Sequence, residues 1–198
     1  MNFTRNLVRD RLAPAIGAAL LTACASVGPG PAATAGPDKI GAVTAPSLGL
    51  FSRIKAPGDR EPVLKLAARG AQVFRCEKRD GQGTWVFRQP DAELLDSAGK
   101  VVGRHGANFS FEHVDGSRLL STIVAYDDAS KPTDLRWLLL TTKSFGKGAF
   151  EGVTHVQRVN TAGGMPPASC DLAHAGRVLR IDFTSDFVFY RARAAAAQ

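Results

Sequence analysis

Residues 108–126 read NFSFEHVDGSRLLSTIVAY, which is the pattern of a β-hairpin. Two runs rich in aromatic and β-branched residues flank Asp115-Gly116, and both residues of this pair tolerate the positive φ angles of a tight turn. The runs 108–112 and 118–126 are therefore predicted to be antiparallel strands joined through this turn.

The same pattern continues on both sides of the hairpin. Short apolar runs alternate with turn residues, as at Ser97-Ala98-Gly99 and Gly146-Lys147-Gly148, and helical spacing of apolar residues is rare. The sequence therefore predicts an all-β domain, a single β-sandwich or small β-barrel of about nine antiparallel strands. Besides the hairpin, strands are expected at 72–78, 84–88, 101–105, 135–142, 152–160, 178–184 and 187–191.

One of these strands contains a continuous apolar run, Trp137-Leu138-Leu139-Leu140. Such a run lacks the polar alternation of a half-exposed strand, so this strand is predicted to be buried on both faces. Only residues 92–97 and 170–175 have a pattern compatible with a helical turn.

Residues 1–23 have the features of a bacterial leader. Arg5, Arg9 and Arg11 precede an apolar stretch that is too short to span a bilayer and that ends in small residues, which is the pattern of a secretory signal peptide. Its end, Leu21-Thr22-Ala23-Cys24, resembles the lipobox of bacterial lipoproteins, which implies cleavage before Cys24 and acylation of its thiol and its new amine. The alternative is a plain signal peptide followed by a chance cysteine.

The residues after Cys24 bear on where the protein would be anchored. Ala25, rather than aspartate, follows the cysteine, so the familiar inner-membrane retention signal is missing and a lipid anchor in the outer membrane is expected, on its periplasmic or its surface face. Residues 24–48 are rich in Ala, Gly and Pro and are predicted to form a flexible tether with a reach of about 25–30 Å. Residues 49–198 are expected to form the all-β domain.

The chain has three cysteines. If Cys24 is lipidated, Cys76 and Cys170 remain as one possible pair, and an oxidising periplasm would favour a disulfide between them. Two buried free thiols are the alternative. A metal or nucleophilic role has less support, because neither cysteine lies in a C-x-x-C motif.

Composition and motifs exclude several classes of function. The formal charge is +7, but the basic residues are scattered and do not alternate with aromatic residues, so no nucleic-acid partner is expected. The chain has no P-loop, no dinucleotide-binding glycine motif and no nucleophile elbow, so no cofactor and no metal are predicted.

Several motifs together suggest a family. They are GAQVFRC at 70–76, PDAELLD at 90–96, WLLL at 137–140 and, most specifically, QRVNTAGG at 157–164. The stretch 70–190 resembles domain of unknown function 3455, a family of secreted bacterial and fungal proteins. The family usually carries YAGPTW after its histidine, where this chain has GANFSF, so a ligand surface at that segment would differ in specificity. The resemblance implies an exported β-domain with paired cysteines and no established activity.

Three residues are candidates for catalysis or metal binding. His105 and His113 flank a predicted strand, and Asp115 lies in the turn that follows. His105 would act as a ligand or general base, with His113 and Asp115 as its partners. The alternative is that Asp115 only forms the turn and that the histidines are surface or hydrogen-bonded residues.

The loop that follows residue 159 is the most distinctive candidate for binding. Arg158, Asn160 and Thr161 supply hydrogen-bond donors beside Gly163-Gly164, an arrangement that suits a carboxylate, a phosphate or a sugar hydroxyl. The same residues suit a rigid corner whose side chains satisfy exposed backbone groups. Aromatic residues on predicted strands form either a stacking platform for a glycan or part of the core; these are Trp85, Phe109 and Phe111.

The leading hypothesis is an exported lipoprotein that acts as a non-catalytic envelope module. Its partner would be a glycan, a small anionic ligand or an envelope protein, and the lipid on Cys24 would hold it at the membrane. Two alternatives stay open: a metal-dependent or acid–base hydrolase that uses His105, His113 and Asp115, and a purely structural envelope protein.

Overall fold

The computed structural model describes residues 42–194. The predicted signal peptide, the lipidation site Cys24 and most of the predicted tether lie outside these residues. Within the described part, no helix is long and apolar enough to cross a membrane.

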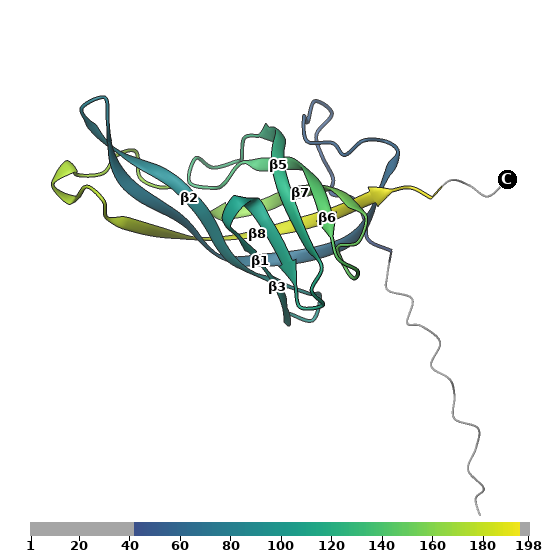
Figure 1. Cartoon of the computed structure of the whole chain (residues 1–198). Helices are drawn as coiled ribbons and strands as arrows, with labels where there is room; N and C mark the ends of the chain where they lie inside the picture. Colours follow the sequence, from purple (N-terminus) through teal and green to yellow (C-terminus); the bar gives the residue numbers. More distant parts are fainter. Residues whose placement is uncertain (1–41, 195–198) are drawn as a thin grey trace, which may run out of the picture. The chain divides into compact units, whose positions relative to one another are not determined.

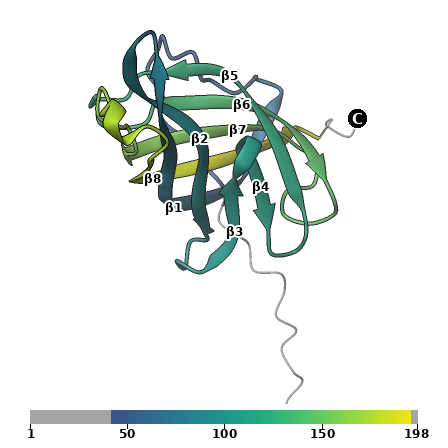
Figure 2. The same cartoon turned by 60° about the vertical axis from the view of Figure 1, so that its left-hand side comes forward.

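The described residues form one closed barrel of eight antiparallel strands, in which each strand pairs with the next in sequence and the last pairs with the first (Figures 1 and 2). Two short 3-10 turns, η1 (Ala107–Phe109) and η2 (Leu172–His174), lie in connections. The strands are β1 (Arg60–Arg79), β2 (Gln82–Leu95), β3 (Val101–Gly106), β4 (Ser110–His113), β5 (Arg118–Asp127), β6 (Trp137–Phe145), β7 (Val153–Gly163) and β8 (Val178–Ala192).

The all-β prediction is confirmed, with eight strands in place of nine. The expected strands 178–184 and 187–191 are one strand, because β8 pairs with β1 without interruption from Arg75↔Val178 to Leu64↔Phe189. β1 starts at Arg60, before the expected residue 72. Residues 92–95, which are compatible with a helical turn in sequence, form the end of β2.

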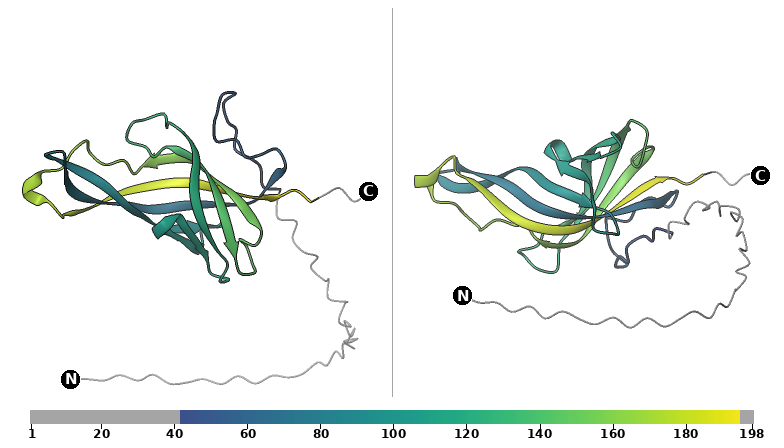
Figure 3. Two further views of the ribbon diagram at one scale, coloured as in Figure 1. Left: turned by 45° about the horizontal axis from the view of Figure 1, so that its top comes forward. Right: turned by 90° about the horizontal axis from the view of Figure 1, so that it is seen from below.

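Three strands extend beyond the barrel as an arm, which we define as residues 72–79 of β1, 82–91 of β2 and 178–182 of β8 (Figure 3). β3 pairs with β2 only from Ala92 to Leu95, so the earlier part of β2 has β1 as its neighbour. A disulfide joins Cys76 of the arm to Cys170 in the β7–β8 connection, with a Cα–Cα distance of 5.9 Å. The predicted pairing of the two cysteines is confirmed.

The barrel interior is filled with apolar side chains at one end. In an antiparallel barrel of this order, the β2–β3, β4–β5 and β6–β7 connections lie at the same end. Phe150, from the β6–β7 connection, is fully buried there. It stacks on Phe189 with 4.9 Å between ring centroids, and Phe111 packs edge-on against both rings. This end of the barrel therefore forms the hydrophobic core.

The segment that precedes β1 covers part of the outer surface of the barrel. Ile54 is fully buried against Leu139 and Val159, and Leu48, at the end of the predicted tether, packs beside them. The side-chain amide of Gln157 donates to the carbonyl oxygen of Ile54 at 2.5 Å. This cover is why residues 138–140 are buried on both faces, as their continuous apolar run indicates.

Candidate functional site

The end of the barrel opposite the core is open. Strand direction places η1, the β5–β6 connection, the β7–β8 connection and the arm at this end. They surround a cavity of about 470 Å³, which we call the mouth pocket. Its polar side chains are those of Gln72, Arg136 and Arg158. Its aromatic side chains are those of Phe74, Trp85, Phe87, Phe109 and Tyr126.

Three of the aromatic side chains, those of Phe74, Phe87 and Phe109, form a continuous wall. Phe87, on the arm, lies 5.8 Å from Phe74 in an edge-on contact and 5.8 Å from Phe109 in a stacked one. Phe87 is also 36% exposed, so the wall presents apolar surface to the opening. Of the three aromatic candidates from the sequence, Trp85 and Phe109 line the mouth pocket, whereas Phe111 is fully buried in the core.

Arg158 is the charged side chain at the inner side of the mouth pocket. Alternation along β7 turns Arg158 inward, and only 6% of the residue is exposed. Its Nε and Nη2 atoms donate to the carbonyl oxygen of Arg136 at 3.2 and 2.9 Å. Burial lowers the pKa of the guanidinium to about 10, so Arg158 remains cationic at neutral pH.

Gln72 contributes a second buried donor to the same pocket. It lies on β1 in the inward row that also contains Ala68 and Phe74, and it is 3% exposed. Its Nε2 atom has no hydrogen-bond partner among the described residues. Gln72 is not among the candidates expected from the sequence, although a polar residue at an inward position of an apolar strand is the signal that identifies it.

His105 is buried between the core and the mouth pocket. Its ring stacks on Phe111 at 4.2 Å and meets Phe187 edge-on at 5.0 Å. Nδ1 donates to the carbonyl oxygen of Ser110 at 2.9 Å. Burial lowers the pKa of His105 to about 3, and the nearby charge of Arg158 acts in the same direction. The imidazole is therefore neutral at physiological pH.

His113 and Asp115 lie together at the core end of the barrel. His113 Nδ1 is 2.9 Å from Asp115 Oδ2, and the same carboxylate accepts hydrogen bonds from the backbone and hydroxyl of Ser117 and from the backbone N–H of Ala149. The hydroxyl of Ser117 contributes most to lowering the pKa of Asp115. The carboxylate thus ties the β4–β5 turn to the β6–β7 connection.

The structure pairs His113 with Asp115 but does not add His105 to them. His105 contacts Phe111 and Ser110, whereas the ring of His113 packs against Phe150. Among residues 42–194, no group of three or more His, Cys, Asp or Glu side chains could hold a metal ion.

The segment after Arg158, expected as a loop from residue 160, instead continues β7 to Gly163 through a bulge between Val159 and Ala162, and its side chains hydrogen-bond to their own protein. Asn160 donates to the Asp186 carboxylate at 2.9 Å, and the Thr161 hydroxyl donates to the carbonyl oxygen of Leu135 at 2.5 Å. Gly163 and Gly164 adopt positive φ angles of 74° and 94°. Of the five binding candidates, only Arg158 lines the mouth pocket, and the loop reaches the pocket through Met165 and Pro166.

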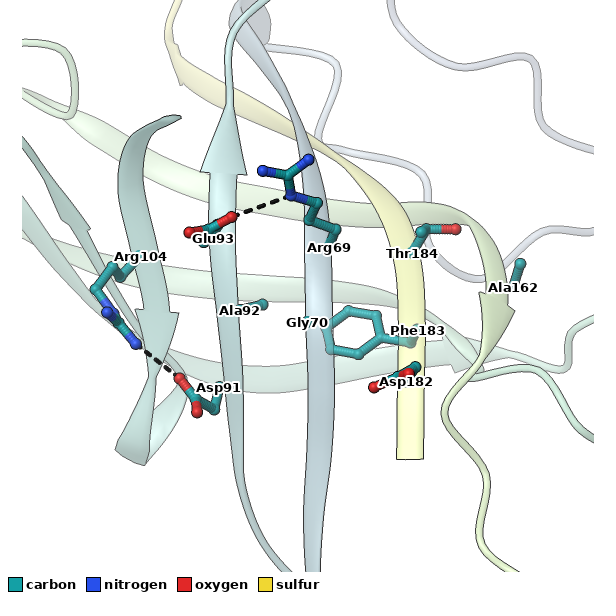
Figure 4. A pocket seen from close by; sticks show the side chains of 10 residues that line it. All are labelled: Arg69, Gly70, Asp91, Ala92, Glu93, Arg104, Ala162, Asp182, Phe183 and Thr184. Atoms are coloured by element: carbon teal, nitrogen blue, oxygen red, sulfur yellow. Dashed lines mark hydrogen bonds and ion pairs between the residues drawn. The ribbon is translucent and has the colours of Figure 1, made fainter. Parts of the chain in front are cut away.

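A second hollow, the outer groove, lies on the outside of β1, β2 and β8 (Figure 4). Gly70, one of its lining residues, packs closely on β2, because a Cβ there would overlap the backbone of Asp91 and Ala92. Four of its five charged side chains are paired, since Arg69 pairs with Glu93 at 3.0 Å and Arg104 with Asp91 at 2.8 Å. The fifth, Asp182, forms no ion pair among the described residues, so the outer groove offers a ligand one unpaired carboxylate.

Comparison with known proteins gives one family. A family model described as "Protein of unknown function (DUF3455)" matches residues 57–191, a range that includes β1 to β7 and all of β8 except its last residue. No curated protein and no solved structure is significantly similar to the chain.

Proposed function

The chain belongs to the DUF3455 family, and we propose that it is a non-catalytic binding module of the bacterial cell envelope. In this proposal the mouth pocket takes up a small molecule with an apolar or aromatic body, and a lipid on Cys24 anchors the module to the outer membrane.

The observation that carries the binding proposal is the unequal filling of the barrel. The side chains of Phe111, Phe150 and Phe189 fill the barrel interior at one end. The other end contains a cavity of about 470 Å³ lined by aromatic side chains. This volume lies in the range of small-molecule sites, which are mostly apolar with a few placed polar groups. A barrel of this strand number has room inside either for side chains or for one small ligand.

The polar groups of the mouth pocket support binding rather than catalysis. Arg136, Arg158 and Gln72 are hydrogen-bond donors, and no Asp, Glu or His side chain lines the pocket. The contact between His113 and Asp115 is the remaining feature compatible with a hydrolase. It lies at the core end, and three further donors already engage its carboxylate.

The envelope location rests on the sequence and on the disulfide. The basic and apolar leader at 1–23 and the lipobox-like end at Cys24 support export and lipidation. The bond between Cys76 and Cys170 agrees with this, because disulfides persist in oxidising compartments such as the periplasm.

Fluorescence titration with N-phenylnaphthylamine, a neutral apolar probe, tests the binding proposal. The full chain carrying Cys24→Ser avoids detergent, because it cannot be acylated. We expect saturable binding, weakened about tenfold or more by Phe87→Ser, which removes part of the aromatic wall. Phe51→Ser is the matched control, because Phe51 is 91% exposed and lies outside the mouth pocket.

Equal losses in the two variants, or no saturable binding by the parent chain, would overturn the proposal. Complete absence of binding would favour the purely structural envelope protein.

A further inference from the structure

We infer that the ligand of the mouth pocket is an amphipathic organic anion whose single carboxylate binds Arg158, with the side-chain amide of Gln72 as a second donor. The inference rests on the proposed binding function and deepens it by naming the chemistry of the ligand.

The first observation is that Arg158 is a buried cation without a counter-ion. The ion pairs among residues 42–194 do not include it, and its hydrogen bonds go to one neutral carbonyl oxygen, that of Arg136. A guanidinium has more N–H groups than that oxygen can accept. Removing a charge from water is costly unless it is paired, so this arrangement suits a site whose partner arrives with the ligand.

The second observation is independent and concerns Gln72. Its Nε2 donor is buried without a partner, although native proteins satisfy nearly all such groups. Gln72 comes from β1 and Arg158 from β7, yet both side chains line the same cavity. One cavity is thus lined by an amide whose donor has no partner and by a guanidinium that has no counter-ion. A carboxylate accepts from both kinds of group.

The other groups around the mouth pocket leave the charge of Arg158 uncompensated. No Asp or Glu lines the pocket, and His105, which lies behind it, is neutral. The second pocket arginine, Arg136, is paired with Asp128 at 2.9 Å and lies over the ring of Tyr126. One unpaired positive charge matches a monoanion, whereas a phosphate dianion would keep one negative charge without a cationic partner.

A matched pair of ligands shows whether the affinity depends on the negative charge of the ligand or only on its shape. Naphthoate and naphthamide share one aromatic ring system, but naphthoate carries a charged carboxylate where naphthamide carries a neutral amide. Each ligand is titrated into the full chain carrying Cys24→Ser with N-phenylnaphthylamine already bound, and displacement of this probe is measured. We expect naphthoate to displace the probe about 10- to 100-fold more tightly than naphthamide. Arg158→Met should abolish this preference, and Gln72→Leu should reduce the affinity for naphthoate several-fold.

Arg136→Met is the matched control: it removes an arginine from the same pocket, but one whose charge is already paired. It should keep the preference for naphthoate. The ligand-free Arg158→Met protein supplies a second readout, the urea midpoint of unfolding. Because Arg158 is a buried charge without a counter-ion, this midpoint should equal or exceed that of the parent.

Each outcome separates the two proposals. Probe binding with equal displacement by the two naphthyl ligands overturns the anion inference and leaves the binding function intact. The anion inference is also overturned if Arg158→Met keeps the preference for naphthoate. It is overturned as well if the urea midpoint of Arg158→Met falls sharply, because the arginine would then be a structural residue. If titration calorimetry detects no binding of either the probe or naphthoate, both proposals fail.

Discussion

The imidazole of His105 shows what the pattern of residues could not reveal. In sequence, His105 stands near His113 and Asp115 and has the appearance of a catalytic group. In the barrel, its ring is stacked on Phe111 and its only ring proton is donated to Ser110. A neutral imidazole in this position satisfies a backbone carbonyl and fills space between aromatic rings, both of which contribute to stability.

The burial of His105 predicts a pH-dependent stability. Its pKa falls from 6.5 to about 3 in the folded protein, so below pH 6.5 the unfolded chain binds a proton that the folded chain rejects. Stability is therefore complete above pH 6.5 and decreases as the pH falls from 6.5 toward 3. Between about pH 7.5 and about pH 5, His105 should account for about 2 kcal/mol of lost free energy of unfolding.

Urea unfolding at the two pH values measures this loss. His105→Gln keeps a hydrogen-bond donor but does not titrate, so the loss between the two pH values should shrink by about 2 kcal/mol in this variant. His174→Gln removes an exposed imidazole and should leave the loss nearly unchanged. An equal loss in His105→Gln and the parent would contradict the buried, neutral state of His105.

Side-chain parity explains which residues of the candidate site could be predicted. Arg158 was expected to bind because of its place in QRVNTAGG, and it does line the mouth pocket. Gln72 could have been found from inward alternation along β1. Phe87 and Tyr126 could not, because their convergence depends on the register across β1–β2 and on barrel closure, neither of which local sequence determines.

At the scale of elements, the turns were predicted better than the strand lengths. Asp115-Gly116 joins β4 to β5 as its residue types require, with Gly116 at a φ of 87°. β1 extends over 20 residues, far more than the expected strand at 72–78. Strand length depends on the partner strands: β8 pairs with β1 from Arg60 to Arg75, and β2 continues the pairing to Arg79.

The disulfide is the covalent brace of the arm, and its removal should lower stability measurably. Cys76 and Cys170 are 94 residues apart, so their bond restricts a long loop in the unfolded chain. The entropic model gives a contribution of about 4 kcal/mol to the free energy of unfolding. Urea unfolding of the Cys76→Ser/Cys170→Ser double variant, compared with the oxidised parent, should show this loss.

Two comparisons give the disulfide experiment its specificity. Reduction of the parent with dithiothreitol should reproduce the loss, and the double variant should then be insensitive to dithiothreitol. A double variant as stable as the oxidised parent would mean that pairing of β1 with β2 and β8 alone holds the arm.

At the scale of the whole molecule, closure of the barrel determines where a ligand can bind. The β1–β8 pairing closes the sheet around the barrel, so that only the arm keeps open strand edges, and it leaves the barrel with two ends. One end contains Phe150 and the core, and the other contains the mouth pocket with Arg158. The sequence predicted an all-β domain but did not choose between a sandwich and a barrel, because that choice depends on whether the first and last strands meet.

The segment before β1 crosses the outside of the barrel between its two ends. Ile54 and Leu48 cover the outside of β6 and β7. The hydroxyl of Ser52 donates to the carboxylate of Asp127 at 2.6 Å, at the end of β5 where the β5–β6 connection begins. The chain then returns to the opposite end, where β1 starts, so this segment bridges the two ends on the outer surface.

The anchoring proposal predicts that Cys24→Ser prevents acylation of the chain, its cleavage before residue 24 and its transfer to the outer membrane. Two or more acyl chains bind a bilayer stably, whereas a single chain binds it only marginally. After expression in a bacterium with lipoprotein-processing enzymes, the parent should partition into the outer-membrane fraction, and its intact mass should correspond to an acylated chain that begins at Cys24. Cys24→Ser should lose both properties.

The Cys76→Ser/Cys170→Ser variant controls for the loss of a thiol as such and should remain acylated in the membrane fraction. A parent chain without acyl groups, or one that keeps residues 1–23, would contradict the lipoprotein proposal while leaving the mouth-pocket proposals to their own tests.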